Sequence, residues 1–160
     1  GYHGKFVIPD ANLSKGVKYT PDLNYTDQRV AASFILYPKP MGIQAEYNIG
    51  KGPEFNKLTD SIEVQSLKGG YITLNYMAKF KKQIILPFTR FQYYDGGKKH
   101  EKDARSYKVN ELEVGVEWQP LKEFELVLMY TISKRRYEDF AKQDNYQSGN
   151  LLRIQAQVNF

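Results

Sequence analysis

The sequence predicts an all-β fold: a transmembrane antiparallel up-and-down β-barrel with seven or eight strands. First, apolar and polar residues alternate along most strand candidates, which gives each strand one apolar and one polar face. Second, short and long connections alternate along the chain. Third, the chain is rich in aromatic residues, with 13 Tyr and 9 Phe. A transmembrane barrel needs apolar residues only at every second strand position, and it places aromatic residues at its membrane interfaces.

Composition narrows the class further. The 160 residues are enough for one domain, so we treat residues 1–160 as a single unit. The chain has no cysteine, which excludes disulfides and thiolate metal sites. No run of apolar residues is long enough for a transmembrane helix. The net charge of +5 is modest, and we expect no nucleic-acid partner.

The first half of the chain contains a weak strand candidate and three stronger ones. The weak candidate ends at Pro9 and is followed by a polar, turn-rich stretch. The glycine pair Gly69-Gly70 predicts a bulge or kink in the fourth candidate. The four candidates are residues 2–8, 29–37, 41–49 and 61–80.

The second half contains four more candidates, one of them with an unclear phase. Ile84, Leu86 and Phe88 indicate one outer face, but Arg90 shares their parity, so we expect Pro87 to mark a bulge that resets the register. The last strand alternates without interruption from Leu152 and ends on an aromatic residue. The four candidates are residues 83–94, 109–118, 123–133 and 150–160.

The connections predict how the strands are arranged in a membrane. Short turns lie at 38–40, 81–82 and 119–122, whereas long loops span roughly 10–29, 50–61, 95–108 and 134–150. A meander with all short turns at one end is typical of outer-membrane barrels, where that end is periplasmic. Aromatic residues on the apolar faces next to these turns are predicted to line the membrane interface: Phe80, Trp118, Phe124 and Phe160.

The polar faces are predicted to line the barrel interior. A charge inside a barrel must be hydrated or paired, and Arg153 is the nearest candidate base for the glutamates of the last strands. Together with Glu46 and Glu123, the inner face then carries six acids against four bases, which is no ladder of bases. The predicted pore-lining residues are Arg29, Lys79, Arg90, Glu111, Glu113, Glu117, Glu125 and Arg153.

Four stretches together resemble the C-terminal part of the phosphate-selective porin O and P family. They are residues 69–76, 86–97 and 110–120 and the terminal LLRIQAQVNF. The resemblance implies a porin of the bacterial outer membrane, surrounded by lipid, through which small hydrophilic solutes, including anions such as phosphate, diffuse passively. Members of the family are longer, so these residues are expected to be the last half or less of a larger barrel. The terminal strand also resembles the signal that the barrel-assembly machinery recognises. Whether the protein forms a homo-oligomer is left open.

Three alternatives remain at this stage. A complete eight-stranded barrel with a filled interior would act as a binding or structural protein. A soluble barrel would explain the alternation but not the asymmetry of the connections. An enzyme is not expected, because His3 and His100 have no serine or acid at a catalytic spacing, and no cofactor or metal site is predicted. The basic runs 98–99 and 134–136 lie among acids and are interpreted as solvated loops.

Overall fold

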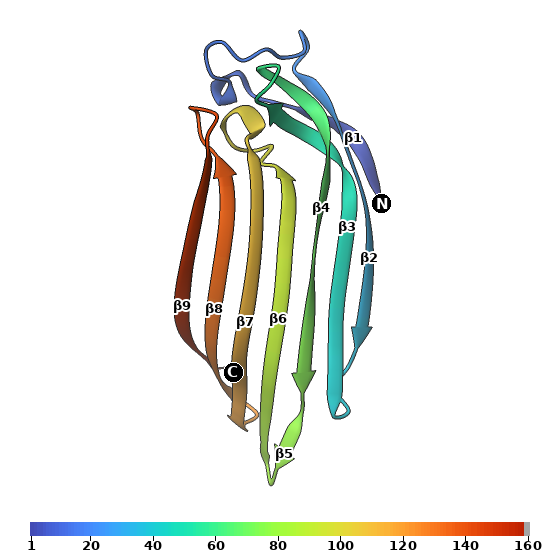
Figure 1. The fold of residues 1–160 in the computed structure, drawn as a ribbon. Helices are drawn as coiled ribbons and strands as arrows, with labels where there is room; N and C mark the ends of the chain where they lie inside the picture. The colour runs from blue at the N-terminus through green and yellow to red at the C-terminus, as the bar shows by residue number, and fades with distance from the viewer. Residues whose placement is uncertain (159–160) are drawn as a thin grey trace.

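The computed structural model describes residues 1–158, which form one long, curved antiparallel sheet (Figure 1). Two short 3-10 turns, η1 (Asp10–Asn12) and η2 (Lys102–Ala104), lie in the connections. No helix among these residues is long and apolar enough to span a membrane. The strands are β1 (Tyr2–Val7), β2 (Asn24–Leu36), β3 (Met41–Asn56), β4 (Ser61–Tyr76), β5 (Ala78–Phe80), β6 (Gln83–Gly97), β7 (Ser106–Leu121), β8 (Phe124–Glu138) and β9 (Asp144–Val158).

The strands follow one another across the sheet as a meander. Their order is β1-β2-β3-β4-β6-β7-β8-β9. The short β5 follows β4 after Met77 and also pairs with β6. The backbone N–H of Met77 donates to the carbonyl oxygen of Pro40 at 2.7 Å, where the pairing of β4 ends. The predicted all-β antiparallel meander is therefore confirmed. Within the described residues β1 and β9 do not pair with each other, so the sheet is open.

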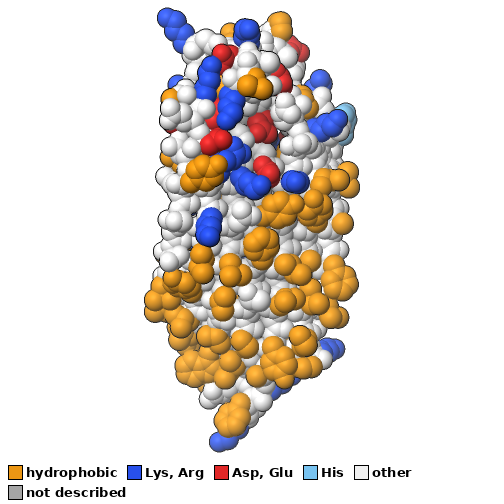
Figure 2. All heavy atoms as spheres, viewed as in Figure 1, with side chains coloured by type: hydrophobic (Ala, Val, Ile, Leu, Met, Phe, Trp, Pro, Cys, Tyr) orange, Lys and Arg blue, Asp and Glu red, His pale blue; other side chains and the backbone are white. Residues whose placement is uncertain are grey.

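The strand register aligns the apolar faces into continuous rows. One row crosses six strands through Phe34, Ala45, Ile72, Phe91, Leu112 and Ile132. Figure 2 shows apolar side chains gathered on this face over the lower part of the strands, with charged side chains above them. On β6 the uncharged positions of this face run from Ile85 to Tyr93, a length of about 26 Å along the strand. If the strand is tilted by about 40° from the barrel axis, this length spans about 20 Å along the axis. This height is close to the apolar band of about 25 Å that outer-membrane barrels present to lipid.

Two sequence-based expectations about register are wrong. The pairing of β3 with β4 continues through Gly69 and Gly70, and the pairing of β6 with β7 continues through Pro87, so neither position is a bulge. On β6 the odd positions, such as Phe91, share the apolar face, and Ile84, Leu86 and Phe88 lie on the opposite one. The phase was unclear because this part of β6 is apolar on both faces. Arg90 nevertheless lies on the polar face, as its assigned parity requires.

The strands are longer than the sequence predicts, and three of the expected long loops are short. The connections at this end of the sheet are residues 8–23, 57–60, 98–105 and 139–143. Strand pairing extends well above the apolar band, for example to Asn56↔Ser61 and Glu138↔Asp144. Above the band both faces of a strand are polar, so the period-two pattern that marks a strand disappears from the sequence.

A small apolar cluster lies at the long-loop end. Ile8, Tyr25 and Ile62 are almost fully buried and pack with Phe55 and Ala104. Above the pair Lys68↔Asp95, β4 no longer pairs with β6, and the hairpin of β3 and β4 bends over the end of β6. A Cβ atom at Gly97 would lie 2.3 Å from the carbonyl oxygen of Pro53, so only glycine permits this approach.

Candidate functional site

The face of the sheet opposite the apolar rows carries all eight predicted pore-lining residues. The register places Thr73, Arg90, Glu113 and Thr131 in one row across four strands. A neighbouring row contains Gln92, Glu111 and Ser133. The eight residues come from six strands: Arg29 in β2, Lys79 in β5, Arg90 in β6, Glu111, Glu113 and Glu117 in β7, Glu125 in β8, and Arg153 in β9.

Arg90 is held in place by an aromatic ring. Its guanidinium lies 4.6 Å from the centroid of the Tyr71 ring, a cation–π contact. The hydroxyl of Tyr71 accepts a hydrogen bond from the Gln44 amide at 3.1 Å, which fixes the ring in turn. The Nε atom of Arg90 is buried without a hydrogen-bond partner. Within residues 1–158 no ion pair joins Arg90 to its register partner Glu113, so the guanidinium is oriented without being neutralised.

The acids on this face are solvated or bound by amides. The Gln92 amide donates to Glu111, and the Gln119 amide donates to Glu117. Arg153 lies opposite Met129 in the register, and no ion pair joins it to a glutamate within residues 1–158, so its pairing with the glutamates of β7 and β8 stays a prediction. A curved face that is charged and amide-rich in this way can line water.

The structure changes the charge count of this face at two positions. Arg135 shares the face through its register partners Val109 and Gln147, although its position was assigned to a loop. The alternation that continues from Ser133 to Arg135 could have revealed it. Glu123, which was assigned to the interior, precedes β8 and lies in the turn after β7.

The predicted interface aromatics that the structure describes lie near the short turns. Phe80 is largely exposed, and the Trp118 indole N–H donates to the Gln83 side-chain oxygen at 3.0 Å. Phe124 begins β8, whereas Phe160 lies outside the described residues.

A second aromatic pair occurs at the other end of the apolar band. Tyr47 and Tyr93 share a row with Gly70 between them, and their hydroxyl oxygens are 3.3 Å apart. Because Gly70 has no side chain, the two rings can meet across β4. No local pattern in the sequence indicates this pair, since it depends on which residues face each other across three strands.

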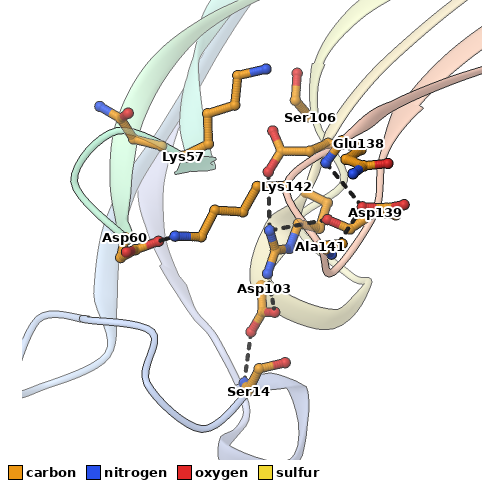
Figure 3. Close-up of polar contacts among 12 residues, drawn as sticks. Ser14, Lys57, Asp60, Asp103, Ser106, Glu138, Asp139, Ala141 and Lys142 are labelled. Carbon is orange, nitrogen blue, oxygen red and sulfur yellow. Dashed lines mark hydrogen bonds and ion pairs between the residues drawn. The ribbon is translucent and has the colours of Figure 1, made fainter.

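The connections 8–23, 57–60, 98–105 and 139–143 pack together as a loop cap, and buried charges join them (Figure 3). The Arg105 guanidinium donates to Asp103 and to Glu138, each at 3.0 Å, and to the carbonyl oxygen of Asp139 at 3.3 Å. It also lies 3.7 Å from the centroid of the Phe55 ring. Asp103 and Glu138 are almost fully buried. Connections 98–105 and 139–143 and strands β3 and β8 thus meet at one buried basic group.

Further contacts tie the first long loop and the hairpin tips to this cluster. Asp103 accepts the backbone N–H of Ser14 at 2.7 Å. Buried Asp27 contacts Lys99 and accepts from Arg29 at 3.4 Å. At the rim, Lys142 pairs with Asp60 at 2.5 Å. The loop cap is therefore a packed structure that stands over one end of the sheet.

Asp139 organises the connection from β8 to β9. The backbone N–H of Gln143 and the Asn145 amide donate to its carboxylate at 3.0 and 2.8 Å, and the N–H of Ala141 donates at 2.9 Å. These hydrogen bonds, led by that of Gln143, lower the pKa of the Asp139 carboxyl below its usual value.

The two histidines make contacts of a structural kind. A ring nitrogen of His3 lies 3.0 Å from the Gln28 side-chain oxygen, and the His100 ring meets the Phe6 ring edge-on. Within residues 1–158, no group of three or more histidine and acidic side chains is arranged to hold a metal.

Comparison with known proteins identifies one family. The family model described as phosphate-selective porin O and P matches residues 11–160. No curated protein and no solved structure matches the chain.

Proposed function

Since this chain belongs to the phosphate-selective porin O and P family, we propose that it forms part of the wall of a water-filled channel in the bacterial outer membrane. Small hydrophilic solutes, including anions such as phosphate, diffuse through this channel. The observation that carries the proposal is the separation of the two faces. Apolar rows cross the sheet on one face, and Arg90, the β7 glutamates and Arg153 lie on the other.

The two edges of the sheet support a barrel larger than eight strands. β1 covers only Tyr2–Val7, and β9 is exposed along nearly its whole length. Unpaired backbone N–H and C=O groups are very unfavourable in lipid, so both edges need partner strands. Eight strands enclose only enough space for side chains, whereas about sixteen leave an aqueous channel. Residues 1–160 are therefore one part of that larger barrel domain. The barrel is assembled through recognition of its C-terminal strand.

The charges on the polar face favour a channel whose ion preference is weak in this portion. In the membrane-level rows three bases (Lys79, Arg90, Arg153) face the same side as five acids (Glu46, Glu111, Glu113, Glu117, Glu125), and Arg29 and Arg135 lie on this side above those rows. Selectivity that survives high salt must come from charges within the constriction, because salt screens exposed loop charges within about 10 Å at 0.1 M. A phosphate preference therefore requires bases from the rest of the barrel.

Electrical recording tests the proposal. The full-length protein, purified from its native membrane in detergent, is inserted into planar bilayers under a KCl gradient, and the reversal potential is measured. We expect stepwise conductance with a small reversal potential that decreases as salt rises. Absence of conductance would contradict the channel and favour a filled barrel with a binding or structural role. Strong anion selectivity at about 1 M salt, where the Debye length is about 3 Å, would show that other strands set the preference.

A further inference from the structure

We propose that a basic groove on the lipid-facing side of the sheet binds the phosphate group of a lipid in the leaflet at the long-loop end. This inference rests on the proposed membrane orientation of the sheet. The groove has a volume of about 810 Å³ and lies over β6, β7, β8 and β9. We call it the headgroup groove and define it by its lining residues on the apolar face, Asp95, Lys108, Asn110, Lys134, Arg136, Asp144 and Tyr146; Arg135 and Gln147 of the opposite face also line it.

The register shows that these residues share the apolar face. Asp95, Lys108, Arg136 and Tyr146 form one row across the four strands, and Lys68 precedes them on β4. The row below contains Asn110 and Lys134 and begins with Tyr93. The same positions lower on these strands are the apolar Leu112 and Ile132. The headgroup groove is thus the direct continuation of the lipid-facing surface.

The height of the groove matches the headgroup region. Lys134 lies in the same row as the Tyr47–Tyr93 pair, at the upper limit of the apolar band. Tyrosine prefers the interface between acyl chains and water, where its ring is apolar and its hydroxyl is hydrated. Charged side chains also appear on this face immediately above the apolar surface (Figure 2). A cation at this level can reach a lipid phosphate without entering the hydrocarbon.

The charge arrangement leaves room for an anion. Lys108 and Arg136 are directly opposite each other, an unfavourable pairing of like charges. Lys108 lies 3.3 Å from Asp95. Arg136 lies 3.0 Å from Asp144 and also donates to the Ser106 hydroxyl at 2.8 Å. Lys134 is exposed, and within residues 1–158 no ion pair joins it to an acidic side chain. On this face of the groove Lys108, Lys134 and Arg136 thus outnumber Asp95 and Asp144, and a phosphate group complements the excess.

The occupant is a lipid phosphate rather than a soluble anion because the groove opens on the face of the apolar band. A soluble anion would approach from water, above the rows that carry the cations. A phosphorylated lipid would place its chains on Leu112 and Ile132 and its phosphate between Lys134 and Arg136.

Lipid binding by the full-length protein in detergent tests the inference. The probes are bisphosphorylated lipid A and its dephosphorylated form, titrated against wild-type protein and two variants and followed by native mass spectrometry. Wild type should bind the bisphosphorylated form more tightly. Lys134→Gln should weaken that binding about fivefold, and Lys108→Gln with Lys134→Gln about 25-fold, because each cation near the surface contributes comparably. Lys82→Gln, in the turn at the opposite end, is the matched control and should bind as wild type does.

Several outcomes would overturn the inference. Equal binding of the two lipid forms, or wild-type binding by Lys134→Gln, would show that no phosphate is recognised in the headgroup groove. Displacement of the lipid by inorganic phosphate at an equal concentration would show a site for the free anion instead. Conductance of the same preparation is recorded in parallel. A protein that conducts but does not discriminate overturns the lipid site alone, and one that discriminates but does not conduct overturns the channel alone.

Discussion

Replacing Arg105 with methionine should release the loop cap from the end of the sheet. Methionine keeps an unbranched apolar side chain against Phe55, but it removes the only charge that the structure places between Asp103 and Glu138. Both acids are at most 5% exposed. Breaking a buried ion pair by removing one partner costs about 3–5 kcal/mol, because the remaining charge stays buried without a partner.

Hydrogen exchange of the full-length protein in detergent measures this effect locally. A cost of this size should accelerate amide exchange in 98–105 and 139–143 by about 10²- to 10⁴-fold, while the sheet keeps its protection. Lys142→Met is the control, since Lys142 and Asp60 form an exposed ion pair whose loss costs about 1 kcal/mol or less.

A compensating variant makes the reasoning refutable. Adding Asp103→Asn and Glu138→Gln to Arg105→Met removes the uncompensated charges and should restore part of the protection. The Asn side-chain oxygen can still accept the backbone N–H of Ser14. If Arg105→Met leaves exchange in the loop cap unchanged, or if the triple variant exchanges faster than the single one, buried charge does not hold the cap together.

Three further predictions concern the sheet and the channel. Gly70→Val should lower the free energy of unfolding by about 1–3 kcal/mol, measured by thermal unfolding, because a Cβ at position 70 would lie 2.4 Å from the Glu46 carbonyl oxygen. Gly149→Val is the control and should have little effect, because a Cβ at position 149 meets open space. NMR titration should show that the pKa of the Asp139 carboxyl lies below its usual value of 3.8. Because the folded-state pKa is depressed, the stabilisation from this carboxylate is present above pH 3.8 and is lost as the pH falls through the folded-state pKa. An ordinary pKa would contradict the hydrogen-bonded loop geometry. Arg153→Gln should shift the reversal potential toward cation preference by at most about fivefold in permeability ratio, and no shift would remove Arg153 from the conducting wall.

The sequence alone determined which residues share a face within the membrane. In this part of the sheet one face of each strand is apolar and the other is polar, so stretches such as 112–118, 124–132 and 152–158 show the period-two pattern directly. The resemblance of four stretches to the porin family also came from the sequence, and the family match confirms it. The predicted assignment of faces was wrong only in the part of β6 where both faces are apolar.

The tertiary structure decided what lies beyond the apolar band. There both strand faces are polar, so neither the extension of the strands nor the position of Arg135 produces a clear period. Contacts such as Ser14 with Asp103, or Arg105 with Glu138, join residues far apart in sequence, and no local pattern encodes them. The Tyr47–Tyr93 pair and the headgroup groove likewise depend on which residues meet across neighbouring strands, which only the register of the folded sheet fixes.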